Sequence, residues 1–420
     1  MPAGPTEWFE EARFGMFVHF GLYSLAARHE WVRSREKMSD EDYDRYLEQF
    51  DPDLFDAAEL ARSARAAGMR YAVLTAKHHD GFCLFDSELT GYTSARATGR
   101  DLVAEFAAAM RAEGLRVGLY YSLLDWRHPD FTIDQYHPLR DSAPPDANAT
   151  RDMARYRAYM NGQVRELLTG YGPIDLLFFD FTYPAKGPAD WGAEELMATA
   201  RALNPQIVVN DRLGIPGDYV TPEQYQPDRP LTRDGGQVRW EACHTLNGSW
   251  GYDRDNHDYK DPALLIRMLV QSVACAGNLL LNVGPTGRGA LDPRARHTLG
   301  AIGEWMSLHA RAVHGAGPSA FTPPPNALYT QRAGRLYLHL LSWPLKHVHL
   351  PGLAGRVRYA QFLHDGSEVR FHQADGDQHE HNNLALPGQP PGTLTLTLPI
   401  AAPDVPLPVV ELVLRDDDGS

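Results

Sequence analysis

The chain has 420 residues, of which 43% are hydrophobic and 22% charged, a balance typical of globular proteins and not of disordered ones. Its length exceeds one average domain and suggests two or three. The formal net charge is −14, and such an acidic surface repels phosphate backbones, so we expect no nucleic-acid partner. A neutral substrate would be neither attracted nor repelled by this field.

The N-terminal stretch MPAGPTEWFEEARFGMFVHFG lacks a basic start and a long apolar core, because charged residues interrupt it. We therefore expect no signal peptide, and no apolar run elsewhere is long enough to predict a membrane span. The three cysteines, Cys83, Cys243 and Cys275, are odd in number and widely spaced. This spacing argues against a disulfide framework and fits a reduced, cytoplasmic location.

Short apolar runs alternate with longer helical patterns up to about residue 314. Most of the runs are nearly continuous in apolar residues, as expected of strands buried on both faces of a parallel sheet. The predicted strands are 14–20, 71–76, 117–122, 174–180, 206–210, 237–240 and 278–284.

Helical spacing of apolar residues appears between these strands, clearly over 101–114, 152–172 and 262–277. Repeated strand–helix units over some 300 residues favour a (β/α)8-like barrel, which would be the catalytic domain over 1–314. A doubly wound open sheet is the alternative, because periodicity alone does not separate the two.

A Gly/Pro-rich break, GAGPSAFTPPP at 315–325, is typical of a linker. The pattern after it changes to short alternating runs at 335–341, 346–351, 357–363, 393–399 and 409–415. These predict a small all-β sandwich over 326–420. The polar stretch 372–383 is predicted to be a solvated hairpin loop rather than a metal site.

Polar side chains follow the apolar runs at one end of the predicted barrel. Active sites of such barrels are built at the carboxyl ends of the strands, from several strands together. A single histidine there could be structural, but five successive strands ending in this way indicate a site. The residues concerned are His19, His78, His79, Tyr121, Asp180 and Arg212.

The sequence KHHDGF at 77–82 contains common metal ligands, but no tightly spaced pattern such as HExxH accompanies it. We therefore expect no metal and no cofactor. Neutral histidines beside Trp31, Tyr121 and Arg212 suit the hydroxyl groups of a neutral polyol better. No dinucleotide fingerprint or nucleophile-elbow motif is present.

Asp180 ends the most apolar predicted strand, so its carboxylate is expected at the mouth of the barrel in a dry, aromatic setting. The alternative is a carboxylate that only caps the following loop. Glycoside hydrolysis with retention needs two carboxyl groups ~5–5.5 Å apart. Candidates for the second are Glu223, Glu241, Glu30 and Asp218.

Several of these segments together resemble glycoside hydrolase family 29, the α-L-fucosidases. They are WFEEARFGMFVHFG, the EW at 30–31, KHHDGF, GLYYS with DW, FFDF around Asp180, NDR at 210–212, WEAC through SWGY, and NLLLNVGP. The resemblance runs from residue 8 to the end, and its motifs occur in the family's order. It implies a retaining exo-α-L-fucosidase that acts on fucosylated oligosaccharides or glycoconjugates. A homo-oligomer is an expectation separate from this resemblance.

The resemblance also implies roles for individual residues. Asp180 matches the family's nucleophile, and Trp250 matches an aromatic wall for the C5 methyl group of fucose. The residue after the nucleophile is often Gly in the family, whereas this chain has Phe181. The residues that match positions holding the fucose hydroxyls are His19, Glu30, Trp31, His78, His79 and Tyr121, with Arg212 beyond the next strand.

The acid/base is the least constant residue of the family. We assign it to Glu223, in GDYVTPEQ, with Glu241 of WEAC as the rival. Two other functions remain open at this point: a glycosidase for another sugar with fucose-like stereochemistry, and a fucose-binding protein without catalysis.

Overall fold

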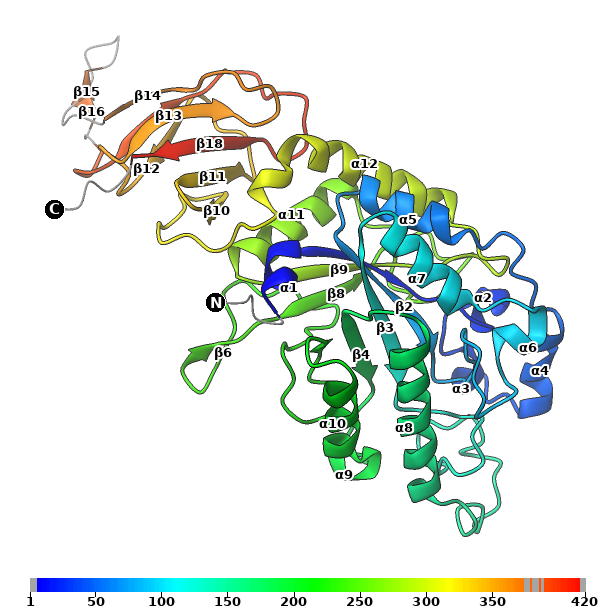
Figure 1. The fold of residues 1–420 in the computed structure, drawn as a ribbon. Helices are drawn as coiled ribbons and strands as arrows, with labels where there is room; N and C mark the ends of the chain where they lie inside the picture. Colours follow the sequence, from blue (N-terminus) through cyan, green and yellow to red (C-terminus); the bar gives the residue numbers. More distant parts are fainter. Residues whose placement is uncertain (1–5, 374–377, 380–384, 387–388, 416–420) are drawn as a thin grey trace.

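The computed structural model describes residues 6–373, 378–379, 385–386 and 389–415 (Figure 1). Seven parallel strands form one sheet in the order β5-β4-β3-β2-β1-β9-β8. Every residue of six of these strands is buried except Arg116 at the start of β3, as the apolar runs predicted. The strands are β1 Phe14–Val18, β2 Tyr71–Lys77, β3 Arg116–Ser122, β4 Leu176–Asp180, β5 Val208–Val209, β8 Glu241–Thr245 and β9 Asn278–Val283.

The two edge strands, β5 and β8, are joined by the irregular segment 218–224 instead of a regular eighth strand. Parallel bridges connect Asn210 to Tyr219 on the β5 side and Glu223 to Cys243 on the β8 side. The amide of Cys243 donates to the carbonyl of Pro222 over 3.0 Å. Since both edges are paired, the sheet closes into a barrel in which the irregular segment 218–224 takes the place of one strand. The predicted barrel-like fold is confirmed.

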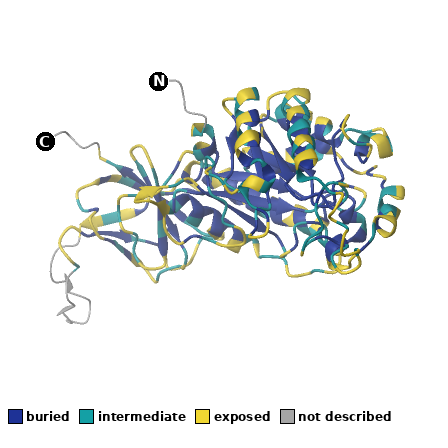
Figure 2. Ribbon diagram, turned by 90° about the horizontal axis from the view of Figure 1, so that it is seen from below, coloured by how far each residue is buried: buried dark blue, intermediate teal, exposed yellow. Residues whose placement is uncertain are grey.

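Helices cover the outside of the barrel, and Figure 2 shows buried strands surrounded by helices whose outer faces are exposed. Aspartates cap several of them: Asp101, Asp152, Asp261 and Asp292 each accept a hydrogen bond from a backbone amide in the first turn. The long helices are α5 Ala57–Ala66, α7 Leu102–Ala112, α8 Met153–Gly170, α10 Ala193–Leu203, α11 Pro262–Ala274 and α12 Pro293–His309. The short ones are α1 Glu7–Ala12, α2 Tyr23–Ala26, α3 Val32–Arg35, α4 Asp40–Glu48, α6 Ser94–Thr98, α9 Pro188–Trp191 and η1 Ala310–Ala312.

The strand predicted at 237–240 is wrong. Its first residue belongs to β7 Gly236–Gln237, which forms an exposed hairpin with β6 Thr232–Arg233. The barrel strand is β8 Glu241–Thr245, whose five residues are all buried. Its sequence EACHT contains three polar residues, so no apolar run marks it.

The C-terminal part packs two antiparallel sheets face to face, in the orders β10-β11-β18-β13 and β12-β17-β14. Leu338, Leu350 and Leu396, from three strands of the two sheets, share one core, so the predicted sandwich is confirmed. β10 and β14 were not predicted. The strands are β10 Ala327–Arg332, β11 Arg335–Leu340, β12 His347–Leu350, β13 Val357–Phe362, β14 Arg370–Gln373, β15 Gln378–His379, β16 Ala385–Leu386, β17 Leu394–Thr397 and β18 Val409–Leu414.

Two residues of the polar stretch 372–383 extend β14 and two more form β15, while the rest lies outside the described residues. The segment 315–325 contains no helix or strand, and the domain boundaries stay a prediction. In the part of the chain that the structure describes, no helix is long and apolar enough to cross a membrane.

The sandwich is fixed firmly to the barrel domain. Tyr337, Leu363 and Val409 belong to the core of the barrel domain. The hydroxyl of Thr330 donates to the carbonyl of Ala312 over 2.7 Å. The sandwich is therefore joined to the barrel domain next to the end of α12.

Two glycines of α12 test how closely helix α5 packs on α12. Gly303 is buried, and a Cβ there would lie 2.5 Å from the carbonyl oxygen of Ala66 in α5, whereas a Cβ at Gly300 would meet nothing within 4 Å. We expect Gly303→Ala to lower the free energy of unfolding by about 1–3 kcal/mol through overpacking. Gly300→Ala should raise it by up to ~1 kcal/mol through helix propensity. Chemical denaturation of both variants checks this, and equal effects would contradict the close packing of α5 on α12.

Candidate active site

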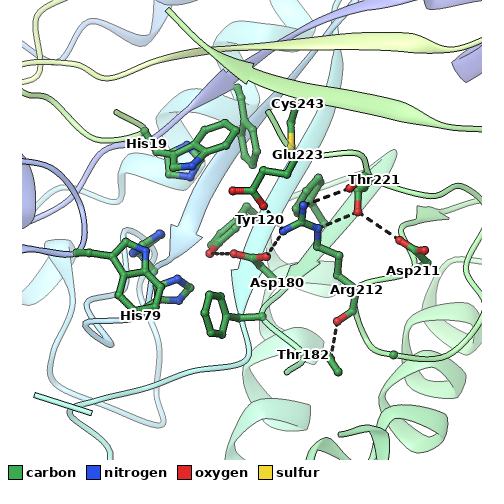
Figure 3. Close-up of a pocket in the computed structure, with 17 residues that line it drawn as sticks. His19, His79, Tyr120, Asp180, Thr182, Asp211, Arg212, Thr221, Glu223 and Cys243 are labelled. Carbon is green, nitrogen blue, oxygen red and sulfur yellow. Dashed lines mark hydrogen bonds and ion pairs between the residues drawn. The ribbon is translucent and has the colours of Figure 1, made fainter. Parts of the chain in front are cut away.

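A cavity of about 400 Å³ opens at the carboxyl ends of the barrel strands (Figure 3). It brings together most of the residues that the sequence singled out. Those lining it are His19, Trp31, His78, His79, Asp180, Arg212, Glu223 and Trp250.

Asp180 is the last residue of β4, and its two carboxylate oxygens have different partners. Oδ1 accepts a hydrogen bond from Arg212 Nη1 over 2.7 Å, and Oδ2 accepts one from the hydroxyl of Tyr120 over 2.7 Å. Burial alone would raise the pKa of Asp180, but the charge of Arg212, with smaller contributions from His79 and Tyr120, lowers it below its ordinary value. Asp180 is thus held ionised in a nearly dry site, as a nucleophile must be.

Arg212 links Asp180 to the second carboxylate. Its Nη1 also lies 2.7 Å from Glu223 Oε2, so one nitrogen contacts both acids. The Asp180 and Glu223 oxygens that it contacts therefore lie within twice that distance of each other, so the two carboxyl groups are close neighbours. Thr221 fixes the guanidinium by accepting from its Nε over 2.8 Å (Figure 3).

Glu241 occupies the opposite end of the barrel. It begins β8, is fully buried, and does not line the cavity. The hydroxyl of Tyr71 donates to its Oε2, and burial raises its pKa to about 8. The structure therefore separates the rival carboxyl from Asp180 and leaves Glu223 beside it. Asp218, another early candidate, is bonded to Arg201 and the Val209 amide instead.

The three cavity histidines are neutral, because burial lowers the pKa of His19 and His79 to about 4 and that of His78 well below its ordinary value. The Asn282 amide group donates to the Trp250 carbonyl, so its Oδ1 accepts from His19 Nδ1 over 2.6 Å.

The hydroxyl of Ser122 donates to the carbonyl of Leu124, so its oxygen accepts from His79 Nδ1 over 2.6 Å. These networks assign the proton to Nδ1 in both His19 and His79. Each ring is left with Nε2 as an acceptor, which suits the hydroxyl groups of a sugar.

The prediction that Tyr121 contacts the substrate is wrong. Tyr121 is fully buried on the outer face of β3, where its hydroxyl donates to Gln163 of α8 over 2.8 Å. Successive residues of a strand face opposite sides, so its neighbour Tyr120 points into the barrel and reaches Asp180. The strand was identified correctly, but the inward-facing tyrosine was not.

Glu30 also differs from the expectation, because it does not line the cavity. It is buried behind the wall, and its Oε2 accepts from the amide of Gly251, next to Trp250. Burial opposes its ionisation, yet its contact with His29 and the Gly251 amide lower its pKa to about 2. Glu30 thus holds the loop that carries Trp250.

Several further residues line the cavity that sequence reasoning did not assign to the site, among them Tyr120, Thr221 and Cys243. Tyr120 and Cys243 could have been found from strand alternation, had the register of β3 and β8 been known. Within the described ranges, no group of three His, Cys, Asp or Glu side chains is placed to hold a metal ion.

The pKa of Glu241 gives a pH-dependent prediction. Between its ordinary value of 4.5 and about 8, the unfolded chain releases this proton and the folded chain keeps it, so Glu241 reduces stability progressively as the pH rises through this window. Glu241→Gln mimics the protonated acid. We expect its melting temperature to be close to wild type at pH 5 and higher than wild type at pH 8. Parallel melting curves across this window would contradict the buried, protonated carboxyl.

Comparisons with known proteins agree with the family resemblance found in the sequence. The Alpha-L-fucosidase family model matches residues 3–311. The tissue alpha-L-fucosidase of Rattus norvegicus is 30% identical over 422 residues, covering 92% of this chain and 87% of its own.

Two solved structures are also similar. Alpha-L-fucosidase isoenzyme 1 from Paenibacillus thiaminolyticus superposes with a TM-score of 0.92 at 42% identity, covering 98% of this chain and 99% of its own. A Bacteroides thetaiotaomicron GH29 alpha-L-fucosidase, a trapped covalent intermediate in complex with 2-fluoro-fucosyl fluoride, has a TM-score of 0.85 at 26% identity and covers 98% and 96%.

Proposed function

The chain belongs to the alpha-L-fucosidase family of glycoside hydrolases, and from that premise we propose that it is a retaining exo-α-L-fucosidase. It would remove terminal α-L-fucosyl groups from oligosaccharides or glycoconjugates by double displacement. The observation that carries this proposal is the shared contact of Arg212 Nη1 with Asp180 and Glu223, which supports the carboxyl spacing of a retaining enzyme.

In the first step, a carboxylate oxygen of Asp180 attacks the anomeric carbon. The bond from that carbon to the leaving oxygen breaks, and the oxygen takes its electron pair together with a proton from Glu223. Asp180 becomes a neutral ester, and Glu223 becomes a carboxylate. One negative charge has moved from Asp180 to Glu223, and Arg212 contacts both groups, so it compensates this charge before and after the step.

In the second step, Glu223 accepts a proton from water as the water oxygen attacks the anomeric carbon. The ester bond breaks, and Asp180 returns to its carboxylate form beside Arg212 and Tyr120. The side chain of Glu223 is 41% exposed, while that of Asp180 is 13% exposed. Water can therefore reach the acid/base more readily than the nucleophile.

The surroundings suit fucose. Three neutral histidines offer hydroxyl contacts, and Trp250 packs against His19 at 5.3 Å between ring centres and against Phe17 at 6.0 Å, which forms an apolar surface for the C5 methyl group. The trapped covalent intermediate of the Bacteroides thetaiotaomicron enzyme supports a covalent step in this family.

Replacement of the nucleophile tests the first step. Asp180→Ala and Asp180→Asn should lower kcat by ~10⁴-fold or more on an aryl α-L-fucoside. Azide should partly restore the Asp180→Ala rate by filling the vacated space, and the product should be a fucosyl azide of inverted configuration. An Asp180→Asn rate above about one hundredth of wild type would contradict the assignment.

Replacement of the acid/base should give an effect that depends on the leaving group. Glu223→Gln should slow hydrolysis of fucosyl-oligosaccharides far more than the first step on an aryl fucoside, whose phenol leaves without a proton. A burst of phenol followed by a slow steady state is expected, and azide should accelerate the steady state. Glu241→Gln is the matched control and should show no burst. Equal losses on both substrates for Glu223→Gln would assign it a structural role.

A further inference from the structure

Phe181, directly after the nucleophile, has an unusual backbone conformation. Its φ is 86°, in the left-handed region that bulky side chains rarely adopt and that glycine adopts freely. This chain therefore keeps a large ring at a position where its backbone is strained.

The strained turn determines where the ring goes. In a continued strand, the residue after Asp180 would face the helices, because successive side chains alternate. Phe181 instead lines the cavity. Its ring centre lies 5.1 Å from both Trp31 and His79, and these two are 4.9 Å apart. Tyr136 and Tyr183, at 5.2 and 5.4 Å, add two more aromatic contacts that stabilise this placement.

Phe181 also ends a continuous arc of rings along the cavity. The arc begins with Trp250, which is 5.3 Å from His19. His19 is 5.6 Å from His78, and His78 is 4.0 Å from His79. His79 then contacts Phe181 at 5.1 Å. Trp250 stands at one end and Phe181, beside Trp31, at the other, with three neutral histidines between them.

The order of groups around fucose matches this arc. The sugar carries a methyl group on C5 and hydroxyls on C4, C3 and C2 in turn. If the methyl group packs on Trp250, the three hydroxyls face the three histidines, and the C2 edge reaches Phe181. This orientation of the sugar agrees with the order of residues along the chain. Asp180 must reach C1, which adjoins C2, and Phe181 directly follows Asp180.

We propose that Phe181 is a specificity-determining residue whose ring closes the C2 end of the sugar pocket and excludes fucosyl groups substituted on O2. This inference rests on the proposed function, because it takes fucose as the bound sugar. With the ring in place, only an unsubstituted 2-hydroxyl fits between His79 and Phe181.

The test compares kcat/KM for 4-nitrophenyl α-L-fucoside with its 2-O-methyl and 4-O-methyl ethers. Phe181→Gly and Phe181→Ala should raise the ratio of the 2-O-methyl ether to the parent by at least about tenfold over wild type, a size typical of room for one carbon. The 4-O-methyl ratio should change by less than about threefold, since that group lies toward Trp250. Phe181→Tyr keeps the ring and should retain the wild-type ratios. Comparing ratios removes the intrinsic reactivity of each ether.

A wild-type enzyme that hydrolyses the 2-O-methyl ether as well as the parent would overturn the proposal. So would an unchanged 2-O-methyl ratio in both variants, or an equal rise for both ethers. Calorimetric binding of L-fucose and 2-O-methyl-L-fucose to wild type and Phe181→Gly supplies an arm without turnover. If the parent fucoside is not hydrolysed, the proposed function fails, and the binding selectivity still decides the role of Phe181. Thermal unfolding identifies a variant that does not fold, and the remaining one then gives the answer.

Discussion

The contact of one guanidinium nitrogen with two carboxylates is the interaction on which the site depends. Asp180 and Glu223 would repel each other at this separation, and Asp180 lies in a mostly desolvated setting. Arg212 is itself partly buried, with 19% of its side chain exposed, and the charges of Asp180 and Glu223 raise its pKa against the effect of burial. Removing Arg212 would leave Asp180 as an unpaired charge in this setting, which is costly.

The irregular segment 218–224, which takes the place of one barrel strand, allows Arg212 to contact both carboxylates. Asp180 ends β4 and Arg212 follows β5, and these two strands are neighbours in the sheet. A regular eighth strand would alternate its side chains with fixed spacing. Segment 218–224 instead pairs with β5 at Tyr219 and with β8 at Glu223, and between these bridges Thr221 reaches Arg212. The same segment therefore closes the barrel, orients the cation and presents the second carboxyl.

The extent to which the sequence predicted this arrangement follows from the signals that its residues give. Buried parallel strands produce apolar runs, so six of the seven strands and the polar residues that follow them were found. β8 was missed because its buried side chains include Glu241, His244 and Thr245, whose burial depends on distant partners. Tyr121 was chosen over Tyr120 because an apolar run shows a strand but does not show which face turns inward. The conformation of Phe181 gives no signal in composition, since it depends on the rings packed around it.

The residues on the outer face of these strands support the site from behind. Lys77, the last residue of β2, directly precedes His78 and His79. It is fully buried and pairs with Asp125 at 3.1 Å, and its Nζ lies 4.5 Å from the centre of the Tyr121 ring. Asp125 in turn accepts the amides of Arg127 and His128, and the amide of Trp126 donates to the carbonyl of His79. A buried ion pair contributes little net stability when compared with apolar packing, but it fixes one geometry, because each charge needs the other. The loop after β2 is therefore held against the loop after β3, and His79 is placed between Trp31 and Phe181 by contacts that no substrate touches.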